Sequence, residues 1–477
     1  MRQLEPAAIT LSRRRAPRWS AYTGWTMQSG IARLARQLRW SAYLARQTVG
    51  EAAFPFRSEE AIRRMQSRRV TSMVAHAYQT VPYYRETMDR LGLTPDDLTS
   101  AEDLARLPVL ERDQLQRDPE YFLSAAQPQS AYAVMRSSGS TGSPLTVFWD
   151  WKSWFTVISR RERYRSMVAD LVGRRFGYRE TVITAPGGSP REGERIGRAL
   201  AYVPQLLRPK RQHLSLGDPP TLNIKLITQH QPEVIASYGS YLAALFGYLQ
   251  SHPGAFHQPK AVVFGGDALT EASRRLISEG FRIPVFELYQ AVEAQPIAFG
   301  CAHESVLHVN VDCYPVRVVG LDGRALPLGE VGEVVVSNLE NRATVVLNYR
   351  IGDVAALLPG RCGCGRNLPL LSPIQGRSDE WVEVSNGRRI HPQMVCVPFR
   401  GEDEVWQFQV VQLAPDQLCV DVVSATSTDR EALGRNLLQR FRSTIGEQAS
   451  VEIRFVEAIA PGPSGKVRAV VSRLRDQ

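Results

Sequence analysis

Residues 137–144 form a loop whose residue types suit the binding of phosphate groups. The segment reads Ser-Ser-Gly-Ser-Thr-Gly-Ser-Pro, so two glycines lie among five hydroxyl side chains. Glycines allow the backbone to turn successive N–H groups toward one point, and hydroxyl groups can donate to anionic oxygens. The pattern is not a Walker A motif, because only two residues separate the glycines, and by itself it is also typical of a surface turn. The candidate phosphate-binding residues are Ser137, Ser138, Gly139, Ser140, Thr141 and Gly142.

Five further segments could bind a nucleotide or act on one, and they follow the loop in a fixed order. Each alone also fits a plainer interpretation, because a tyrosine after a buried strand is commonly a core residue and an Arg-Ile-Gly-Asp tetrapeptide is commonly a turn. The segments are Gly265-Gly266-Asp267, Glu287-Leu288-Tyr289-Gln290-Ala291-Val292-Glu293, Tyr349-Arg350-Ile351-Gly352-Asp353, Gly376-Arg377-Ser378-Asp379 and Pro463-Ser464-Gly465-Lys466.

In this order, the loop and the five segments resemble the adenylate-forming superfamily, which includes acyl- and aryl-CoA ligases. The resemblance is greatest to the phenylacetate-CoA ligase and CapK-like branch. It covers nearly the whole chain, because three segments before the loop are also similar to that branch. These are Val81-Pro82-Tyr83-Tyr84-Arg85, Glu102-Asp103-Leu104 and Leu107-Pro108-Val109.

The resemblance implies an ATP-dependent ligase that converts a carboxylic acid to an acyl-adenylate, releases pyrophosphate and passes the acyl group to CoA. Such a reaction requires the enzyme to position two anions and to neutralise the charge that develops between them. By resemblance, the loop holds the β- and γ-phosphates, while Thr141 and Glu293 help to hold Mg²⁺, which screens the leaving pyrophosphate. An amine or another nucleophile of a specialised biosynthetic pathway is the alternative acceptor.

The resemblance also assigns the other contacts to the nucleotide. Tyr289 is expected to stack on adenine, beside Gln290. Asp353 is expected to accept hydrogen bonds from both ribose hydroxyl groups, and Arg377 to donate nearby. The pocket for the base is expected to be lined by Gly265, Gly266 and Asp267.

Lys466 is the strongest candidate for a catalytic residue. It follows a turn rich in proline and glycine, which can project an ammonium group from a small mobile domain, although most turn lysines are merely solvated. In the resembled family the matching lysine contacts the substrate carboxylate and the α-phosphate. Two positions depart from the family pattern. Ser143 stands where a lysine is common in the loop, and Val292 replaces a threonine, which leaves open a slow or specialised activity.

A second constellation, Cys301, His308, Cys362 and Cys364, could bind a metal ion. Cys362-Gly363-Cys364-Gly365 can place two thiolates on one ion, and six residues separate Cys301 from His308. Two such pairs can form a closed Cys₃His zinc site, and His303 could replace His308. These segments also resemble the phenylacetate-CoA ligase branch, some members of which bind structural zinc. Inert buried thiols are the simpler alternative.

Length and composition favour a soluble globular protein of two or three domains, with 477 residues of which 43% are hydrophobic. Because the sequence shows no membrane span or secretory signal and only six cysteines, we expect a cytoplasmic protein. Most of the net charge of +10 lies in residues 1–50, with nine arginines and one acid. Such an arm can contact an anionic membrane surface or an acidic partner. We favour a helix packed on the body through Ile31, Leu34, Leu38 and Leu44, with peripheral membrane contact at most and no specific nucleic-acid binding.

The predicted fold class is α/β, with a large multi-subdomain adenylate-forming domain with mixed sheets and a small mobile α+β C-terminal domain. Helical patterning extends over roughly residues 57–125. From residue 179 onward, apolar runs at 181–184, 233–236 and 261–264 alternate with helical stretches, which indicates buried parallel strands. Residues 331–337 and 343–347 are also predicted to be strands. The expected boundaries are 1–50 for the basic arm, 51–378 for the adenylation domain and 379–477 for the lid domain that carries Lys466.

Other expectations concern substrates and partners. The acid pocket should draw on residues 184–188 and 237–242, and the small domain should pivot near Asp379 to bring residues 387–392 to the site. A homodimer is a possible oligomeric state. A rival of another class is a non-catalytic zinc-stabilised binding protein, but such a protein has no need of Lys466, Glu293 and Asp353 together.

Overall fold

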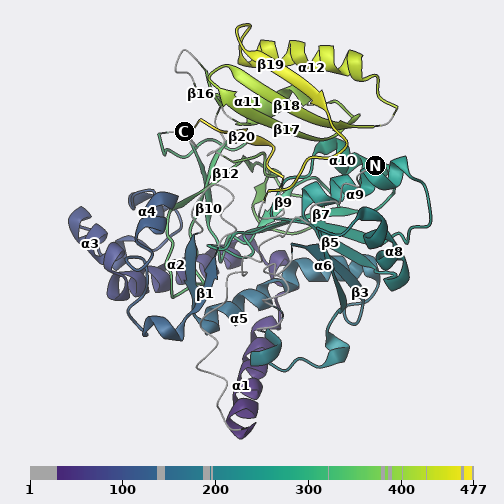
Figure 1. The fold of residues 1–477 in the computed structure, drawn as a ribbon. Helices are drawn as coiled ribbons and strands as arrows, with labels where there is room; N and C mark the ends of the chain where they lie inside the picture. Colours follow the sequence, from purple (N-terminus) through teal and green to yellow (C-terminus); the bar gives the residue numbers. More distant parts are fainter. Residues whose placement is uncertain are drawn as a thin grey trace, which may run out of the picture.

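The computed structural model describes residues 30–136, 145–185, 194, 197–320, 322–377, 382–384, 389–390, 392–399, 401–425, 427–462 and 467–474. Figure 1 shows a large body of helices and sheets, with the C-terminal sheet above it. This mixed α/β architecture confirms the predicted fold class. Expectations for residues 1–29, the phosphate loop 137–144 and Lys466 lie outside the described residues.

Helices dominate the chain before residue 125, as the sequence predicts. Helix α2 begins where Oγ of Ser58 accepts a hydrogen bond from the backbone N–H of Ala61, and α3 has Pro82 at its first position and ends at Gly92 in the left-handed region. The elements are α1 (Gly30–Thr48), η2 (Phe54–Phe56), α2 (Glu59–Thr80), α3 (Pro82–Leu91), η3 (Pro95–Asp97), η4 (Asp103–Arg106), α4 (Arg112–Arg117) and η5 (Gln129–Ala131).

Helix α1 packs on the body against α5 (Trp151–Arg160), as predicted for the helix and for Leu44, but not through Leu34 and Leu38. The indole of Trp40 stacks on Phe155 with ring centroids 4.7 Å apart, and Leu44 packs in the same cluster. Leu34 and Leu38 are each 56% exposed, so their predicted packing role is wrong. An aromatic side chain offers more contact area than a leucine, and this decides the orientation of the helix.

A nine-stranded sheet forms the centre of the large body, in the order β13-β14-β9-β8-β7-β6-β5-β3-β4. Strands β4, β3, β5, β6 and β7 are parallel, and the remainder are antiparallel. The three predicted parallel strands are thereby confirmed as β3, β5 and β6. The strands are β3 (Arg179–Thr184), β4 (Lys210–Ser215), β5 (Val234–Ser237), β6 (Ala261–Phe264), β7 (Val285–Tyr289), β8 (Ala298–Gly300), β9 (Leu307–Val309), β13 (Leu357–Leu358) and β14 (Leu370–Leu371).

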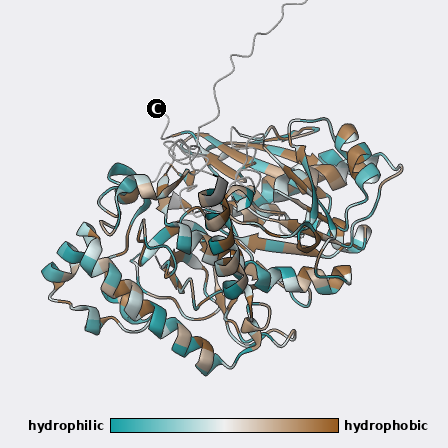
Figure 2. Cartoon of the chain, turned by 90° about the horizontal axis from the view of Figure 1, so that it is seen from below, coloured by the Kyte–Doolittle hydropathy of each residue, from teal (hydrophilic) through white to brown (hydrophobic). Residues whose placement is uncertain are grey.

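Helices flank this sheet, as buried parallel strands require. Figure 2 shows hydrophilic and hydrophobic residues alternating along the outer helices. No helix among the described residues is both long enough and apolar enough to cross a membrane. The flanking elements are α5, α6 (Glu162–Val172), η6 (Gln205–Leu207), α8 (Pro220–His230), α9 (Gly239–Ser251), α10 (Glu271–Arg275) and the π-helical turn η7 (Leu276–Gly280).

Two smaller sheets complete the large body. Strands β1 (Ala133–Arg136) and β2 (Thr146–Trp149) form an antiparallel pair, and they precede and follow residues 137–144 in the sequence. Strands β10 (Val316–Val319), β11 (Gly332–Val336) and β12 (Tyr349–Ala355) form a three-stranded sheet. The prediction of a strand at 343–347 is wrong. This segment is an irregular buried stretch that forms only an isolated bridge, between Thr344 and Leu123, so its apolar character reflects its place in the core.

The C-terminal sheet has the order β19-β18-β17-β20, with β17 and β18 antiparallel and the outer strands parallel to their neighbours. The buried side chains of α12 include Leu433, Leu437 and Phe441, which belong to the same hydrophobic cluster as the sheet. The boundary predicted near Asp379 lies outside the described residues. The elements are β15 (Val382–Glu383), β16 (Arg389–Ile390), α11 (Pro392–Cys396), η9 (Val397–Phe399), β17 (Val405–Ala414), β18 (Gln417–Ser424), α12 (Arg430–Ile445), β19 (Ser450–Phe455) and β20 (Val470–Ser472).

Strand β17 contacts helices α9 and α10 of the large body (Figure 1). The backbone carbonyl of Trp406 accepts hydrogen bonds from Oγ1 of Thr270 at 2.9 Å and Oγ of Ser273 at 2.6 Å. Arg275 and Asp403 form an ion pair with an N–O distance of 2.7 Å. These contacts hold the C-terminal sheet against α9 and α10, the helices that follow β5 and β6 in the chain.

A buried ion network braces the other side of the large body. Arg163 is fully buried and forms a bidentate pair with Asp312 at 2.7 and 2.9 Å and a hydrogen bond to Glu51 at 2.8 Å. Arg69 connects Asp312 to Glu340. Because a buried charge without a partner is costly, this network holds the segment that contains Glu340 firmly against α5 and α2.

Candidate active site

A cavity of about 2610 Å³ lies beside the carboxyl ends of the parallel strands and reaches the C-terminal sheet. Open α/β sheets bind ligands at this edge. Arg136, which directly precedes the phosphate loop, lines the cavity, as do Val467 and Arg468, which directly follow Lys466. The structure thus brings together segments far apart in the sequence. The predicted nucleotide-binding residues that line the cavity are Gly265, Gly266, Asp267, Tyr289, Gln290, Glu293, Asp353 and Arg377.

Glu293 is held in the wall of the cavity by three donors. Its Oε1 accepts a 3.0 Å hydrogen bond from the hydroxyl group of Tyr349 and lies 3.3 Å from Nη1 of Arg112. Its backbone carbonyl accepts a 2.7 Å hydrogen bond from Nδ2 of Asn338. Burial and the charge of Glu293 raise the pKa of Tyr349, so this hydroxyl remains a donor. A carboxylate fixed in this way is a ligand type that Mg²⁺ prefers.

Asp353 interacts with two other predicted site residues. Its Oδ2 accepts a 2.8 Å hydrogen bond from the hydroxyl group of Tyr289, and its Oδ1 lies 3.7 Å from Nη1 of Arg377. Asp353 and Arg377 also form an isolated antiparallel bridge, which joins β12 to the segment before the C-terminal sheet. Tyr289 is only 6% exposed, because most of its ring packs into the main core.

The glycine pair after β6 is required by backbone geometry. A Cβ atom at Gly265 would lie 2.5 Å from the carbonyl oxygen of Leu288 on the neighbouring strand, and Gly266 has a φ of +90°. The carboxylate of Asp267 accepts hydrogen bonds from the backbone N–H and the hydroxyl group of Ser240. Asp267 therefore caps the first turn of α9 as well as lining the cavity.

Gln290 and Glu287, in the same wall, are buried polar side chains in unfavourable surroundings. Oε1 of Gln290 is buried and has no hydrogen-bond partner among the residues that the structure describes. Burial raises the pKa of Glu287 to about 7, even though Arg274 lies 3.7 Å away and opposes the shift. Such groups gather where a ligand completes the hydrogen bonding.

Sequence reasoning missed three residues that contact the predicted site. Arg112 and Tyr349 contact the carboxylate of Glu293, and Nε1 of Trp149 donates a 3.1 Å hydrogen bond to the carbonyl oxygen of Val292. Tyr349 opens a segment that the sequence singled out, although without a role for that residue. Nothing in the local pattern around Arg112 indicates a contact with a residue 181 positions away.

The predicted acid pocket is partly present in the described residues. Thr184, Ser237, Tyr238 and Ser240 line the cavity. Tyr241 does not, and its hydroxyl group accepts a 2.7 Å hydrogen bond from Nδ2 of Asn223. Residues 186–188 lie outside the described residues.

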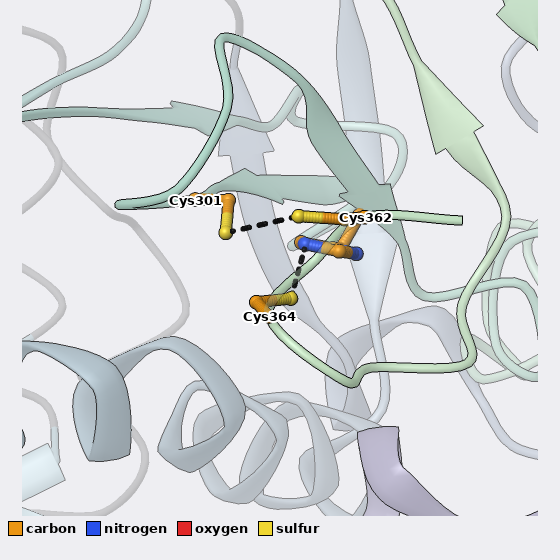
Figure 3. A group of neighbouring side chains, drawn as sticks. Cys301, Cys362 and Cys364 are labelled. Carbon is orange, nitrogen blue, oxygen red and sulfur yellow. Dashed lines mark hydrogen bonds between the residues drawn. The ribbon is translucent and has the colours of Figure 1, made fainter. Parts of the chain in front are cut away.

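The four predicted metal ligands meet at one point, with their ligand atoms all within 4.8 Å of one another. Figure 3 shows the sulfur atoms of Cys301 and Cys362 facing each other, with Cys364 nearby. The two sulfur atoms of Cys301 and Cys362 are 3.5 Å apart, and Sγ of Cys364 lies 3.3 Å from Nε2 of His308. Burial lowers the pKa of His308 to about 4, so the ring is neutral at pH 7. This donor set matches a structural zinc site.

The surroundings of the cluster favour a structural role. His303, the alternative ligand, contacts it through the backbone, whose N–H lies 3.5 Å from Sγ of Cys301. The backbone N–H of Asn367 donates a 2.8 Å hydrogen bond to the carbonyl oxygen of Pro55, and the guanidinium of Arg366 lies over the ring of Phe56. The cluster therefore ties β8 and β9 to the segment that precedes α2.

Comparisons with known proteins show which proteins this chain resembles. The CapK C-terminal domain family matches residues 382–473. A phenylacetate-coenzyme A ligase of Aromatoleum evansii is 27% identical over 437 residues, covering 87% of this chain and 95% of that protein. A phenylacetate-coenzyme A ligase of Thermus thermophilus is 29% identical over 366 residues, covering 74% of this chain and 78% of that protein.

Among solved structures, 2-hydroxyisobutyryl-CoA ligase in the postadenylation state, in complex with R3-HIB-AMP, shares the fold with a TM-score of 0.67 and 19% identity, covering 86% of this chain and 89% of that chain. The same ligase in the thioesterification state has a TM-score of 0.55. Residues 382–473 thus match the CapK C-terminal domain family, most of the chain is similar to phenylacetate-coenzyme A ligases, and its fold is that of 2-hydroxyisobutyryl-CoA ligase.

Proposed function

We propose that this chain is an AMP-forming ligase that activates a carboxylic acid with ATP and transfers the acyl group to CoA. The observation that carries the proposal is the single cavity, which collects Tyr289, Glu293 and Asp353 together with the residues that flank the phosphate loop and Lys466. The relatives named phenylacetate-coenzyme A ligase support the same reaction class.

The reaction has two steps, each with one bond made and one broken. A carboxylate oxygen of the acid attacks the α-phosphorus of ATP, and the bond to pyrophosphate breaks. The thiol sulfur of CoA then attacks the acyl carbon of the adenylate, AMP leaves, and the thiol proton passes to solvent. Both steps gather negative charge on phosphate oxygens, so the cavity must supply cations and donors.

Residues in the wall of the cavity make the proposed contacts with the nucleotide. Asp353, oriented by the hydroxyl group of Tyr289, accepts the ribose hydroxyl groups, and Arg377 donates beside it. Oε1 of Gln290 is an acceptor that the amino group of adenine can satisfy. Glu293, fixed by Tyr349 and Arg112, would hold Mg²⁺ together with Thr141, and the ion would screen the negative charge of the pyrophosphate.

Two arginines offset the missing lysine of the phosphate loop. Ser143 cannot supply the charge that a lysine would, but Arg136 directly precedes the loop and lines the cavity. Arg112, which lines the same cavity, lies beside Glu293. By the family resemblance, Lys466, which lies outside the described residues, would supply a further positive charge to the carboxylate and the α-phosphate. The residues that follow it, Val467 and Arg468, line the same cavity.

The Cys₃His cluster binds one structural Zn²⁺ ion in this proposal. The four ligands form a closed set, which leaves no position for substrate. The ion would connect the loop that carries Cys362 to the strand that carries His308 and, through Arg366, to the segment before α2. Its contribution is stability rather than a chemical step.

ATP–pyrophosphate exchange across a panel of carboxylic acids tests the proposed function. We expect exchange that depends on one class of acid and on Mg²⁺, and a CoA-dependent thioester product with that acid. A protein that binds neither ATP nor AMP by calorimetry, and shows no exchange with any acid, would refute the proposal. Formation of an amide from a supplied amine, with release of AMP and with no thioester formed from CoA, would move the assignment to the alternative acceptor.

A further inference from the structure

One part of the cavity wall is rich in arginines. We call it the arginine branch and define it by Arg161, Arg165, Arg175, Tyr178, Glu180 and Arg211. These residues come from α6 and its N-terminus, β3, β4 and the loop that precedes β3. Thr184 and Tyr238, at the ends of β3 and β5, also line the cavity and belong to the predicted acid pocket. The branch therefore extends the space in which the acid would lie.

Most charges of the branch are already paired. Glu162 accepts a 3.0 Å hydrogen bond from Nε of Arg175, and Glu180 lies 2.6 Å from Nη2 of Arg211. Glu194 lies 3.4 Å from Nη1 of Arg211 and 2.8 Å from Nε2 of His213. The described carboxylates of the branch are thus neutralised by side chains other than Arg161.

Arg161 has no anionic partner among the described residues. Its Nη2 donates a 3.1 Å hydrogen bond to Oε1 of Gln295, a neutral amide, and its buried Nε contacts no acceptor in the part of the chain that the structure describes. Arg211 and Arg165 repel the guanidinium, and Tyr164 and Tyr314 act in the opposite direction. Burial, followed by these like charges, lowers the pKa of this guanidinium.

A guanidinium in this situation destabilises the free protein. Buried charges are normally paired, and removing one partner of a buried pair is strongly destabilising. Arg163, two residues away, shows the usual solution, because two carboxylates satisfy it. Arg161 instead lines the cavity, where a ligand can supply the anion that the described residues do not.

Arg161 is connected through a hydrogen bond to the segment that carries the proposed Mg²⁺ ligand. Its partner Gln295 lies two residues after Glu293, the proposed Mg²⁺ ligand, in the same cavity wall. A ligand bound to Arg161 and to the nucleotide site at once would therefore be an acid with two polar ends. One end is the carboxylate to be activated, and the other is an anion in the arginine branch.

We propose that the acid activated by this chain carries a second carboxylate, which Arg161 binds in the arginine branch. The inference rests on the proposed adenylation function and specifies its substrate class as dicarboxylic acids. The planar guanidinium presents Nε and Nη groups side by side, which matches the two oxygens of a carboxylate.

Exchange kinetics with matched acids test this inference. The probes are α,ω-dicarboxylic acids of increasing chain length, each compared with the monocarboxylic acid of the same length, and 1,4-phenylenediacetate compared with phenylacetate. We expect the wild-type protein to use the best diacid with a kcat/KM about 10- to 100-fold above that of its matched monoacid, the range that one buried charge-assisted pair supplies.

Arg161→Gln should remove that preference. It should lower kcat/KM for the diacid by about 10- to 100-fold, mainly through KM, and leave the monoacid unchanged, because only the second carboxylate contacts Arg161. The matched control is Arg175→Gln, which removes the same charge from the same branch but from a guanidinium already paired with Glu162. This control should keep the preference for diacids.

Thermal unfolding gives an independent measurement. Without ligand, Arg161→Gln should melt at or above the wild-type temperature, because it removes an uncompensated charge, whereas saturating diacid should raise the melting temperature of the wild-type protein only. Equal use of diacids and monoacids by the wild-type protein would overturn the inference while leaving adenylation intact. An equal loss for both acids in Arg161→Gln, or protection by CoA instead of diacid, would also overturn it. Absence of exchange with every acid, together with no binding of AMP, would instead refute the proposed function itself.

Discussion

The hydroxyl group of Tyr289 donates a 2.8 Å hydrogen bond to Oδ2 of Asp353, which joins the end of β7 to the middle of β12. Burial and the charge of Asp353 raise the pKa of Tyr289, so the hydroxyl remains a donor at physiological pH. The carboxylate is therefore oriented before any nucleotide arrives. Preorganisation of this kind reduces the entropic cost of binding.

Substitution at these two positions should affect nucleotide binding to different degrees. Asp353→Ala should weaken the binding of AMP by about 10- to 150-fold, because hydrogen bonds to a charged group contribute roughly 1.5–3 kcal/mol. Tyr289→Phe keeps the ring and loses only the orienting hydroxyl, so its effect should be smaller, roughly 0.5–1.5 kcal/mol. Calorimetric titration with AMP measures both effects. Unchanged affinity in Asp353→Ala would show that this segment is only a turn.

Lys466 should act in the transition state more than in the ground state. Lys466→Ala should reduce the rate of adenylate formation by about 10² or more while ATP affinity remains near the wild-type value. Rapid-quench measurement of the acyl-adenylate separates the two quantities. Lys225→Ala, on the exposed surface of α8, is the matched control. Adenylate formation at the control rate in Lys466→Ala would remove this residue from the mechanism.

Local sequence signals predicted much of the fold and the candidate site, but not the contacts between distant segments. The parallel strands could be predicted because buried apolar runs and glycine-rich ends are local features, and the Cys and His ligands because their types are distinctive. The contact between Arg112 and Glu293 could not, because arginine is common on surfaces and the pairing depends on tertiary packing across 181 residues. The same applies to Arg161, whose importance comes from the absence of a carboxylate among its described neighbours.

The packing of α1 shows a different limit. Helical spacing of Leu34 and Leu38 predicted the helix correctly, but spacing alone does not decide which of two apolar faces is buried. Trp40, on another face, contributes more contact area through its stack on Phe155. The spacing of apolar residues predicts that a helix forms. Which side of the helix is buried depends on the surface of α5 against which it packs.

The raised pKa of Glu287 predicts a specific pH dependence of stability. Its ordinary pKa is 4.5 and its pKa in the folded protein is about 7, so the folded state binds more protons than the unfolded state between these values. Its contribution to stability is therefore complete below about pH 4.5 and is lost as the pH rises through about 7. Glu287→Gln should flatten this decline and become the more stable protein above pH 7.

Urea unfolding at pH 5 and at pH 8 measures this difference. The matched control is Glu279→Gln at an exposed position of η7, which should retain the wild-type slope. Because other groups also titrate, the comparison between the two variants isolates the contribution of Glu287. If the free energy of unfolding changed with pH equally in Glu287→Gln and in the control, the decline could not be attributed to Glu287.

The metal proposal predicts that protein purified without chelators contains about one equivalent of zinc. Cys364→Ser should lower the zinc content and the melting temperature, while exchange activity at low temperature should fall much less, because the cluster braces β8, β9 and the segment before α2. Cys396→Ser, in α11 and outside the cluster, is the control. Metal analysis that finds no zinc in the wild-type protein would show that the four residues are only buried thiols and an imidazole.

Gly247 and Trp406 form a tight contact between the large body and the C-terminal sheet. A Cβ atom at Gly247 would lie 2.6 Å from Cε3 of the indole of Trp406, which is closer than real side chains approach. Gly247→Ala should therefore displace the ring and weaken the domain arrangement seen here, in which the residues after Lys466 line the cavity. We expect adenylation to slow by roughly 10-fold, consistent with loss of about 1–2 kcal/mol of packing.

A double variant distinguishes the clash with the indole of Trp406 from direct damage to α9. If the indole is the obstacle, a smaller side chain at position 406 should relieve the clash, so the double variant Gly247→Ala with Trp406→Leu should be faster than the product of the two single effects predicts. Gly254→Ala is the matched control, because a Cβ there lies 3.9 Å from its nearest neighbour. The measurements are the rate of adenylate formation and the rate of thioester formation from a supplied acyl-adenylate, of which the first should respond more. Strictly additive effects, or equal losses in both half-reactions, would show that the contact does not control the position of the C-terminal sheet.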